Sequence, residues 1–142
     1  MCSVIEYGFT INGSLRGTSP CDATTSDTLG ARVVVQTDAS EIGKTLVAAI
    51  GLRINDIGKG TFYSEQFTPT YSPALHTFNI PFTGVPTQIG TYTFGYGGLG
   101  CSYIYDISNL SSYICYSCTS DDCFEVAVTA PCTVPGCGFV VA

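Results

Sequence analysis

The chain has 142 residues, of which 45% are hydrophobic and only 11% are charged, and its net charge is −6. A chain of this length buries roughly 68–70% of its unfolded surface as one domain, so we expect a single domain over residues 1–142. No Lys or Arg follows Lys59. Because nucleic acids and anionic membrane surfaces are bound through cationic side chains, neither is an expected partner.

The first residues of the chain bear on the compartment in which the protein functions. Residues 1–6 enter a strand-like pattern at once, without a basic region or an apolar core segment, so we expect no signal peptide here. Two explanations of how the protein reaches its site of action remain open. Either an export signal was removed, or the chain is made in a cytoplasm and leaves it later, as a viral structural protein does.

Alternation with a period of two residues dominates the chain and predicts β-strands. Between the first two strands, residues 13–30 form a long Gly/Ser/Thr-rich stretch that we expect to be a loop, either flexible or pinned by Cys21. The segment 41–50 has some helical spacing, but Gly43 and the continued alternation to Ile54 favour a strand. The expected strands cover residues 5–11, 33–37, 46–54, 61–67, 76–80, 90–96, 103–107, 124–128 and 139–141.

These elements predict an all-β fold. Roughly seven to nine short strands separated by Gly and Pro turns are typical of an antiparallel β-sandwich. No internal repeat is visible, and the strongest change in composition comes near residue 100. We therefore expect one sandwich whose C-terminal part, residues 101–142, is rich in cysteine and in loops.

The segment from His76 to Tyr96 resembles the E–F corner of immunoglobulin-like sandwiches. It contains a β-run, a Pro-containing turn and the sequence Gly-Thr-Tyr-Thr-Phe at residues 90–94. The resemblance implies an immunoglobulin-like antiparallel β-sandwich, with Tyr92 at the tyrosine-corner position and its hydroxyl bonded to upstream backbone. The chain has no Trp, so the Cys–Trp–Cys signature of antibody domains is absent. The resemblance concerns architecture and implies no activity.

The cysteines are concentrated in the C-terminal part. We expect disulfides, which suit an oxidising environment, although eight cysteines allow on the order of 100 pairings. Cys2–Cys21 is the predicted N-terminal pair. The spacing of Cys115, Cys118, Cys132 and Cys137 also allows a four-thiolate zinc site, but nearby acidic residues and the absence of basic ones disfavour thiolates there. The disulfide candidates are Cys2, Cys21, Cys101, Cys115, Cys118, Cys123, Cys132 and Cys137.

The sequence offers little material for catalysis, and we expect no catalytic residue, no cofactor-binding residue and no cofactor. The single histidine, His76, lies in a strand pattern and is expected to be structural, and no G-x-S-x-G elbow is present. Residues 95–100 match G-x-G-x-x-G, but a strand-like segment follows where a dinucleotide site needs a helix. The acidic residues Asp121, Asp122 and Glu125 are read as a solvated turn, with an acid/base pair or a calcium site as the alternative.

Tyrosines provide the clearest candidate for recognition. Six of the nine lie between residues 92 and 116, and those facing outward would form a stacking surface for a partner protein or a sugar. The expected binding surface consists of Tyr103, Tyr105, Tyr113 and Tyr116. Two Asn-x-Ser tripeptides, beginning at Asn12 and Asn109, are glycosylation sequons that matter only in a eukaryotic secretory context.

These observations favour a non-enzymatic structural or interaction subunit of an extracellular assembly. A virion surface, decoration or tail protein or a filament subunit fits best, with copies of itself or other assembly subunits as partners. The alternative is a secreted binding module that recognises a glycan or receptor through its tyrosine-rich loops. Low charge, thiol density and the scarcity of catalytic groups support the first reading.

Overall fold

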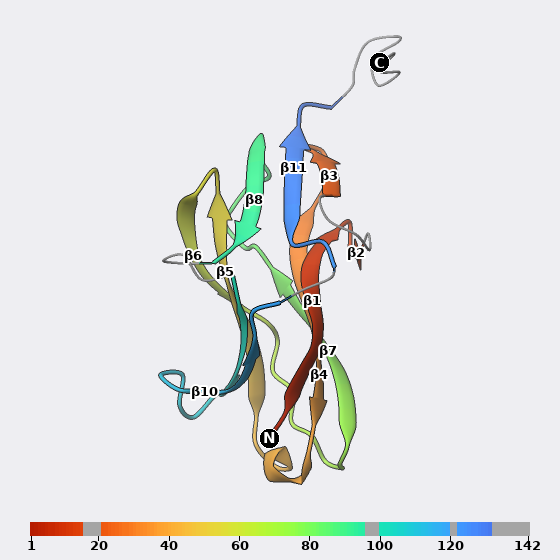
Figure 1. Cartoon of the computed structure of the whole chain (residues 1–142), viewed down its shortest axis with the longest axis vertical. Helices are drawn as coiled ribbons and strands as arrows, with labels where there is room; N and C mark the ends of the chain where they lie inside the picture. The colour runs from red at the N-terminus through yellow and green to blue at the C-terminus, as the bar shows by residue number, and fades with distance from the viewer. Residues whose placement is uncertain (16–20, 96–99, 120–121, 132–142) are drawn as a thin grey trace.

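The computed structural model describes residues 1–15, 21–95, 100–119 and 122–131, which form two packed β-sheets (Figure 1). The first sheet has the strand order β2-β1-β4-β7 and is antiparallel throughout. Its strands are β1 (Ser3–Ile11), β2 (Ser14–Leu15), β4 (Leu29–Thr37) and β7 (Ala74–Pro81). Among the described residues, no helix has the length and apolar character needed to cross a membrane.

The second sheet is built around β5 (Leu46–Ile54). Along one edge β5 pairs with β6, and along the other it pairs with β9 over residues 46–50 and with β8 over residues 52–54. Strand β10 pairs with β9, and β11 pairs with β8. The strand position next to β5 is therefore shared by the two short strands β8 and β9, and the position after it is shared by β11 and β10. The other strands are β3 (Cys21–Thr24), β6 (Ile57–Tyr63), β8 (Gly90–Phe94), β9 (Ser102–Asp106), β10 (Tyr113–Ser117) and β11 (Glu125–Thr129).

This order confirms the expected immunoglobulin-like antiparallel sandwich. Strands β1, β4 and β7 take the places of A, B and E, while β5 takes that of C. The split pairs β8/β9 and β11/β10 take the places of F and G. One pairing is parallel: β3 lies against β11, with Cys21 opposite Val126. A single turn of 3-10 helix, η1 (Ala39–Glu41), links the two sheets between β4 and β5.

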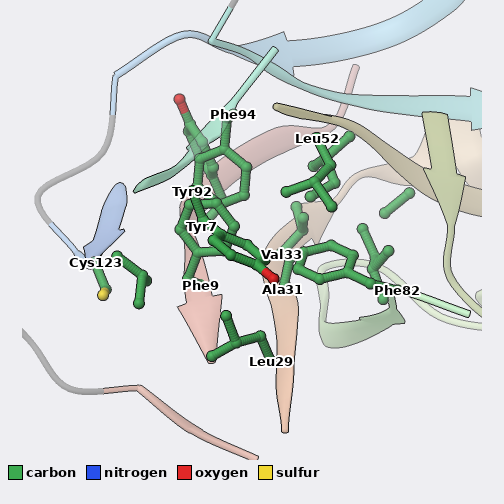
Figure 2. Close-up of a cluster of buried hydrophobic side chains, with 14 of the residues drawn as sticks. Tyr7, Phe9, Leu29, Ala31, Val33, Leu52, Phe82, Tyr92, Phe94 and Cys123 are labelled. Atoms are coloured by element: carbon green, nitrogen blue, oxygen red, sulfur yellow. The ribbon is translucent and has the colours of Figure 1, made fainter. Parts of the chain in front are cut away.

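The tyrosine corner is present as predicted. The Tyr92 ring is buried, and its hydroxyl accepts a hydrogen bond of 2.9 Å from the backbone N–H of Gln88, four residues upstream. The ring meets Phe9 edge to face, and Phe9 in turn stacks on Phe94 with ring centroids 4.0 Å apart. Figure 2 shows these aromatic rings together with Val33 and Leu52 at the centre of the core.

Several details of the strands differ from the sequence prediction. Regular alternation over the predicted strand 5–11 would place Ile5 on the inward face of Tyr7 and Phe9, but Ile5 is exposed because a register shift between Val4 and Glu6 reverses the alternation. Strand β6 begins at Ile57, before the predicted start at Thr61, since positive φ angles at Asn55 and Asp56 form a tight turn from β5. The stretch 13–30 contains strands β2 and β3, and β10 was not predicted.

Six cysteines form three disulfides: Cys2–Cys115, Cys21–Cys123 and Cys101–Cys118. The predicted pair Cys2–Cys21 is wrong: Cys2 bonds to Cys115 of β10, and Cys21 bonds to Cys123 because β3 pairs with β11, which follows Cys123. The zinc alternative is also wrong for its first two ligands, since Cys115 and Cys118 are each bonded to another sulfur. Its other two, Cys132 and Cys137, lie outside the described residues, as do the expected strand 139–141 and Asp121.

The disulfides close loops of very different length, and this sets a test of their contributions. Cys2–Cys115 spans 113 residues and Cys101–Cys118 spans 17. In the chain-entropy account, losing the long loop closure costs about 5 kcal/mol and losing the short one about 3 kcal/mol. We expect the double change Cys2→Ala with Cys115→Ala to lower the free energy of unfolding in urea more than Cys101→Ala with Cys118→Ala. Equal losses would contradict this ranking.

Candidate functional site

Four tyrosines from β9 and β10 come together on the outer face of the second sheet. The ring centroids of Tyr113 and Tyr116 are 4.8 Å apart, and those of Tyr103 and Tyr113 are 5.3 Å apart. Tyr103 also stacks on Tyr116 at 6.0 Å and lies 6.2 Å from Tyr105. All four distances fall within the usual range for interacting aromatic rings. The residues singled out from the sequence therefore form one contiguous cluster.

An irregularity in β10 produces this cluster. Tyr113 and Tyr116 are three residues apart, so regular alternation would point them to opposite faces of the sheet. A register shift between Tyr113 and Cys115 adds one residue, so that Tyr113 pairs with Tyr105 and Tyr116 pairs with Tyr103. The same shift turns Cys115 inward, where it packs against the core and bonds to Cys2 of the opposite sheet.

A fifth ring, Tyr63, extends the cluster to β6 and was missed by the sequence analysis. The strand register places Tyr63, Ala49, Tyr103 and Tyr116 side by side in one row across β6, β5, β9 and β10. The Asn55-Asp56 turn alone would not have found it, because a register shift between Leu52 and Arg53 is what brings Tyr63 opposite Ala49. We call Tyr63, Tyr103, Tyr105, Tyr113 and Tyr116 together the tyrosine surface.

Small side chains of β5 support these rings. Val47 and Ala49 face away from the core, since Leu46, Ala48 and Ile50 face into it. Even so, only 4% of Val47 and 1% of Ala49 remain exposed, because the flanking tyrosines cover them. The rings therefore rest on a packed floor that limits their movement.

The tyrosine surface is exposed and uncharged. Tyr63, Tyr113 and Tyr116 keep between 45% and 51% of their surface in solvent. Tyr105 is more enclosed, and its burial, reinforced by Tyr63 and the neighbouring tyrosines, raises the pKa of its phenol. Its hydroxyl is therefore neutral at physiological pH and can donate or accept a hydrogen bond. In the strand pairs that carry the tyrosines, no charged residue lies between the rings. The other outward positions of these pairs are Val47, Ala49, Gly51 and Thr61.

A cavity of about 140 Å³ opens at the margin of the tyrosine surface. Tyr103 and Tyr105 form one wall, Thr61 contributes a hydroxyl, and Cys101 of the Cys101–Cys118 disulfide bounds it. The backbone of Gly51, which has no side chain, leaves the space open. The full lining is Ala49, Ile50, Gly51, Thr61, Cys101, Tyr103 and Tyr105.

A larger cavity of about 420 Å³ lies at the breaks between β8 and β9 and between β10 and β11. The Tyr7 hydroxyl donates a hydrogen bond of 2.7 Å to the Gly100 carbonyl there, and burial raises the Tyr7 pKa to about 12. The residues after the glycine motif form strand β9 and no helix, so the motif does not open a dinucleotide site. The cavity is lined by Tyr7, Thr93, Phe94, Gly100, Cys118, Thr119, Phe124 and Glu125.

The remaining sequence candidates do not assemble into a reactive centre. His76 faces inward on β7, where its ring stacks on Phe67 at 3.8 Å and meets Phe78 edge to face at 4.6 Å. Asp122 lies beside Glu6, and burial and the Asp122 charge raise the pKa of Glu6. Within the described ranges, no group of three His, Cys, Asp or Glu side chains is placed to hold a metal ion.

Comparisons with known proteins add little. No family model matches the chain, and no curated protein matches it. Among solved structures it is similar to a CARDB domain from Pyrococcus furiosus, described as in complex with di-metal ions, at 16% identity over 89% of this chain and 94% of that chain. The TM-score is 0.36. A likeness of this degree supports no inference about function.

The placement of His76 has a pH-dependent consequence. Burial lowers the pKa of His76 below its ordinary 6.5, against a smaller opposing effect of Glu65. The unfolded chain therefore binds more protons between the folded pKa and 6.5, so the free energy of unfolding rises with pH across that window and levels off above it. We expect His76→Phe, which keeps a ring against Phe67, to make stability less dependent on pH between 5 and 7. Parallel profiles for both proteins in urea denaturation would contradict this expectation.

Proposed function

We propose that this protein is a non-enzymatic structural or interaction subunit of an extracellular assembly, and that the tyrosine surface is its principal contact with neighbouring subunits. A virion surface, decoration or tail protein or a filament subunit is the setting that we favour. The observation that carries the proposal is the contiguous patch of five tyrosines on a rigid sheet face.

Tyrosines are well suited to such a contact. Each ring offers a large apolar area together with a hydroxyl, and it loses little conformational entropy on binding because it has only two side-chain torsions. The neutral phenols and the absence of charged residues between them avoid the cost of stripping water from buried ions. An interface formed here is therefore driven by apolar burial with hydrogen bonds at the ring edges.

The framework holds the patch ready for binding. Val47 and Ala49 support the rings from below, and two disulfides anchor β10, one to the opposite sheet through Cys2 and one to the start of β9 through Cys101. A surface that is ordered before binding loses less entropy when a partner docks. Rigidity of this kind supports a lasting structural contact.

The tyrosine surface also extends to the margins of the sheet. Tyr63 lies on β6 and Tyr113 on β10, and each of these strands pairs with only one neighbour among the described strands. Edge strands present backbone N–H and C=O groups that can pair with another chain. A partner docking on the rings therefore also meets hydrogen-bonding groups at both margins.

The disulfides support the proposed location. Disulfides such as these three form and persist in oxidising environments such as the cell exterior or a released particle. The low charge of the chain points the same way, because subunits that bury much of their surface in an assembly need fewer charged residues.

Self-association through the tyrosine surface can be tested directly. We expect the protein to form defined oligomers at high concentration, and Tyr103→Ser with Tyr116→Ser to weaken association by at least about 30-fold, as loss of interface hot spots does. Sedimentation equilibrium over a range of concentrations measures this. Tyr71→Ser is the matched control, since Tyr71 is 63% exposed and lies outside the tyrosine surface. A strictly monomeric native protein, or an equal effect of Tyr71→Ser, would count against the proposal.

A secreted glycan-binding module is the second candidate, and the 140 Å³ cavity favours it. A sugar ring could stack on Tyr103 or Tyr105 while its hydroxyls bond to Thr61 and to the tyrosine hydroxyls. The cavity holds one ring at most, so this reading implies recognition of a terminal sugar residue.

The glycan reading makes its own prediction. If the protein binds a sugar on a glycan array, Tyr105→Ala should abolish the signal because it removes a wall of the cavity. Thr61→Val, which keeps the shape but removes the hydroxyl, should weaken binding by about 10-fold, in line with one lost hydrogen bond. Tyr71→Ala again serves as the control. Binding that survives Tyr105→Ala would exclude this cavity as the sugar site.

A further inference from the structure

We infer that the folded chain accepts an N-linked glycan at Asn109 and not at Asn12, although both residues begin an Asn-x-Ser tripeptide. This inference concerns a modification site and does not rest on the proposed function. It depends on the different hydrogen bonds that the two asparagines make in the folded protein.

Asn109 is held in a conformation that suits glycosyl transfer. It lies in the turn between β9 and β10, where residues 107–113 are all exposed, and this loop projects away from both sheets beside β10 (Figure 1). The Oδ1 atom of Asn109 accepts hydrogen bonds from the Ser111 hydroxyl at 2.6 Å and from the Ser111 backbone N–H at 3.2 Å. Among the described residues, no hydrogen bond occupies its Nδ2.

The hydrogen bonds within the tripeptide define its chemistry. Two donors on Oδ1 polarise the side-chain amide toward the form that bears more positive charge on nitrogen and more acidic N–H protons. The hydroxyl of the third residue is one of these donors, which gives Ser111 a specific role in the tripeptide. The Nδ2 atom, which must form the new bond, meanwhile faces no competing acceptor in the described structure.

Asn12 presents the opposite arrangement. Its Nδ2 donates to Asp27 Oδ1 at 2.8 Å, and its Oδ1 accepts from the Thr28 backbone N–H at 2.9 Å. The residue also has a positive φ of 53° in the turn that leads to β2. Glycosylation here would have to break the bond to Asp27 and disturb the turn, so the folded state protects Asn12 from modification.

The reaction itself is a substitution at a sugar carbon. The Nδ2 atom of Asn109 attacks the anomeric carbon of a lipid-linked oligosaccharide diphosphate, supplied with its oligosaccharyltransferase. The N–C bond forms as the C–O bond to the diphosphate breaks, and the proton lost from the amide nitrogen passes to a base of the transferase. The lipid diphosphate is the leaving group, and no oxidant or reductant takes part.

A glycan at Asn109 is compatible with the tyrosine surface. The turn lies beyond the Tyr105–Tyr113 pair, which is the last pair of the β9–β10 ladder. A glycan attached there extends from the margin of the surface and does not replace any of its side chains. Modification and docking can therefore be measured independently.

The test uses the full chain with its disulfides intact. The purified folded protein is incubated with a eukaryotic-type oligosaccharyltransferase and a lipid-linked oligosaccharide, and the occupancy of each site is measured by peptide mass spectrometry. We expect modification at Asn109 to exceed that at Asn12 by at least about 10-fold, because Asn12 must first break hydrogen bonds. Asn109→Gln and Ser111→Ala should each abolish the main product, whereas Asn12→Gln should leave it unchanged.

The reduced and alkylated chain provides the matched control. Without the fold, both tripeptides are open to the enzyme, so we expect similar occupancy at Asn12 and Asn109. Equal modification of the two sites in the folded protein would overturn the inference, and so would an unmodified Asn109 in either form. None of these outcomes bears on self-association, which sedimentation of the unglycosylated protein measures separately.

Discussion

The disulfide between Cys2 and Cys115 is the constraint on which both the sandwich and its tyrosine surface depend. It joins the residue before β1 in one sheet to β10 in the other, with Cα atoms 5.8 Å apart. For Cys115 to reach inward, β10 must carry the register shift near its start, and that shift also turns Tyr113 outward beside Tyr116. The bond that closes the sandwich and the cluster that marks its outer face therefore share one local irregularity.

Much of the fold follows from local sequence patterns. The alternation of Leu46, Ala48 and Ile50 in β5 gives the correct inward face, and the Tyr92 corner forms with the predicted hydrogen bond to upstream backbone. The shared outward face of Tyr103 and Tyr105 in β9 likewise follows from alternation. These features are predictable because each depends on strand alternation or on a short segment of neighbouring residues.

The features that were not predicted depend on contacts between distant segments. Cys21 bonds to Cys123 across 102 residues because β3 runs parallel to β11, and nothing in the Gly/Ser-rich stretch around Cys21 indicates that partner. The exposure of Ile5 likewise depends on an extra residue in β1 relative to β4. Register shifts and disulfide pairings are set by the assembled sheets, so alternation within one strand cannot reveal them.

The two outer faces of the sandwich differ in chemistry, and the difference follows from how the chain crosses them. On the first sheet, the segment at Asp122 and Cys123 passes so close to Gly8 that a side chain there would meet the Asp122 Cβ at 2.8 Å. The Cys123 carbonyl accepts a hydrogen bond from Phe9, and the Cys21–Cys123 disulfide secures the crossing. This crossing brings the Asp122 and Glu6 carboxylates together.

Burial and the neighbouring Asp122 carboxylate raise the pKa of Glu6, although Arg32 offsets part of this effect. Such a charged pair would be costly to bury further against another surface. The second sheet presents neutral rings on a packed floor of Val47 and Ala49. One outer face therefore carries paired carboxylates and the other carries uncharged aromatic rings, and the second face can be covered by another molecule at a lower desolvation cost.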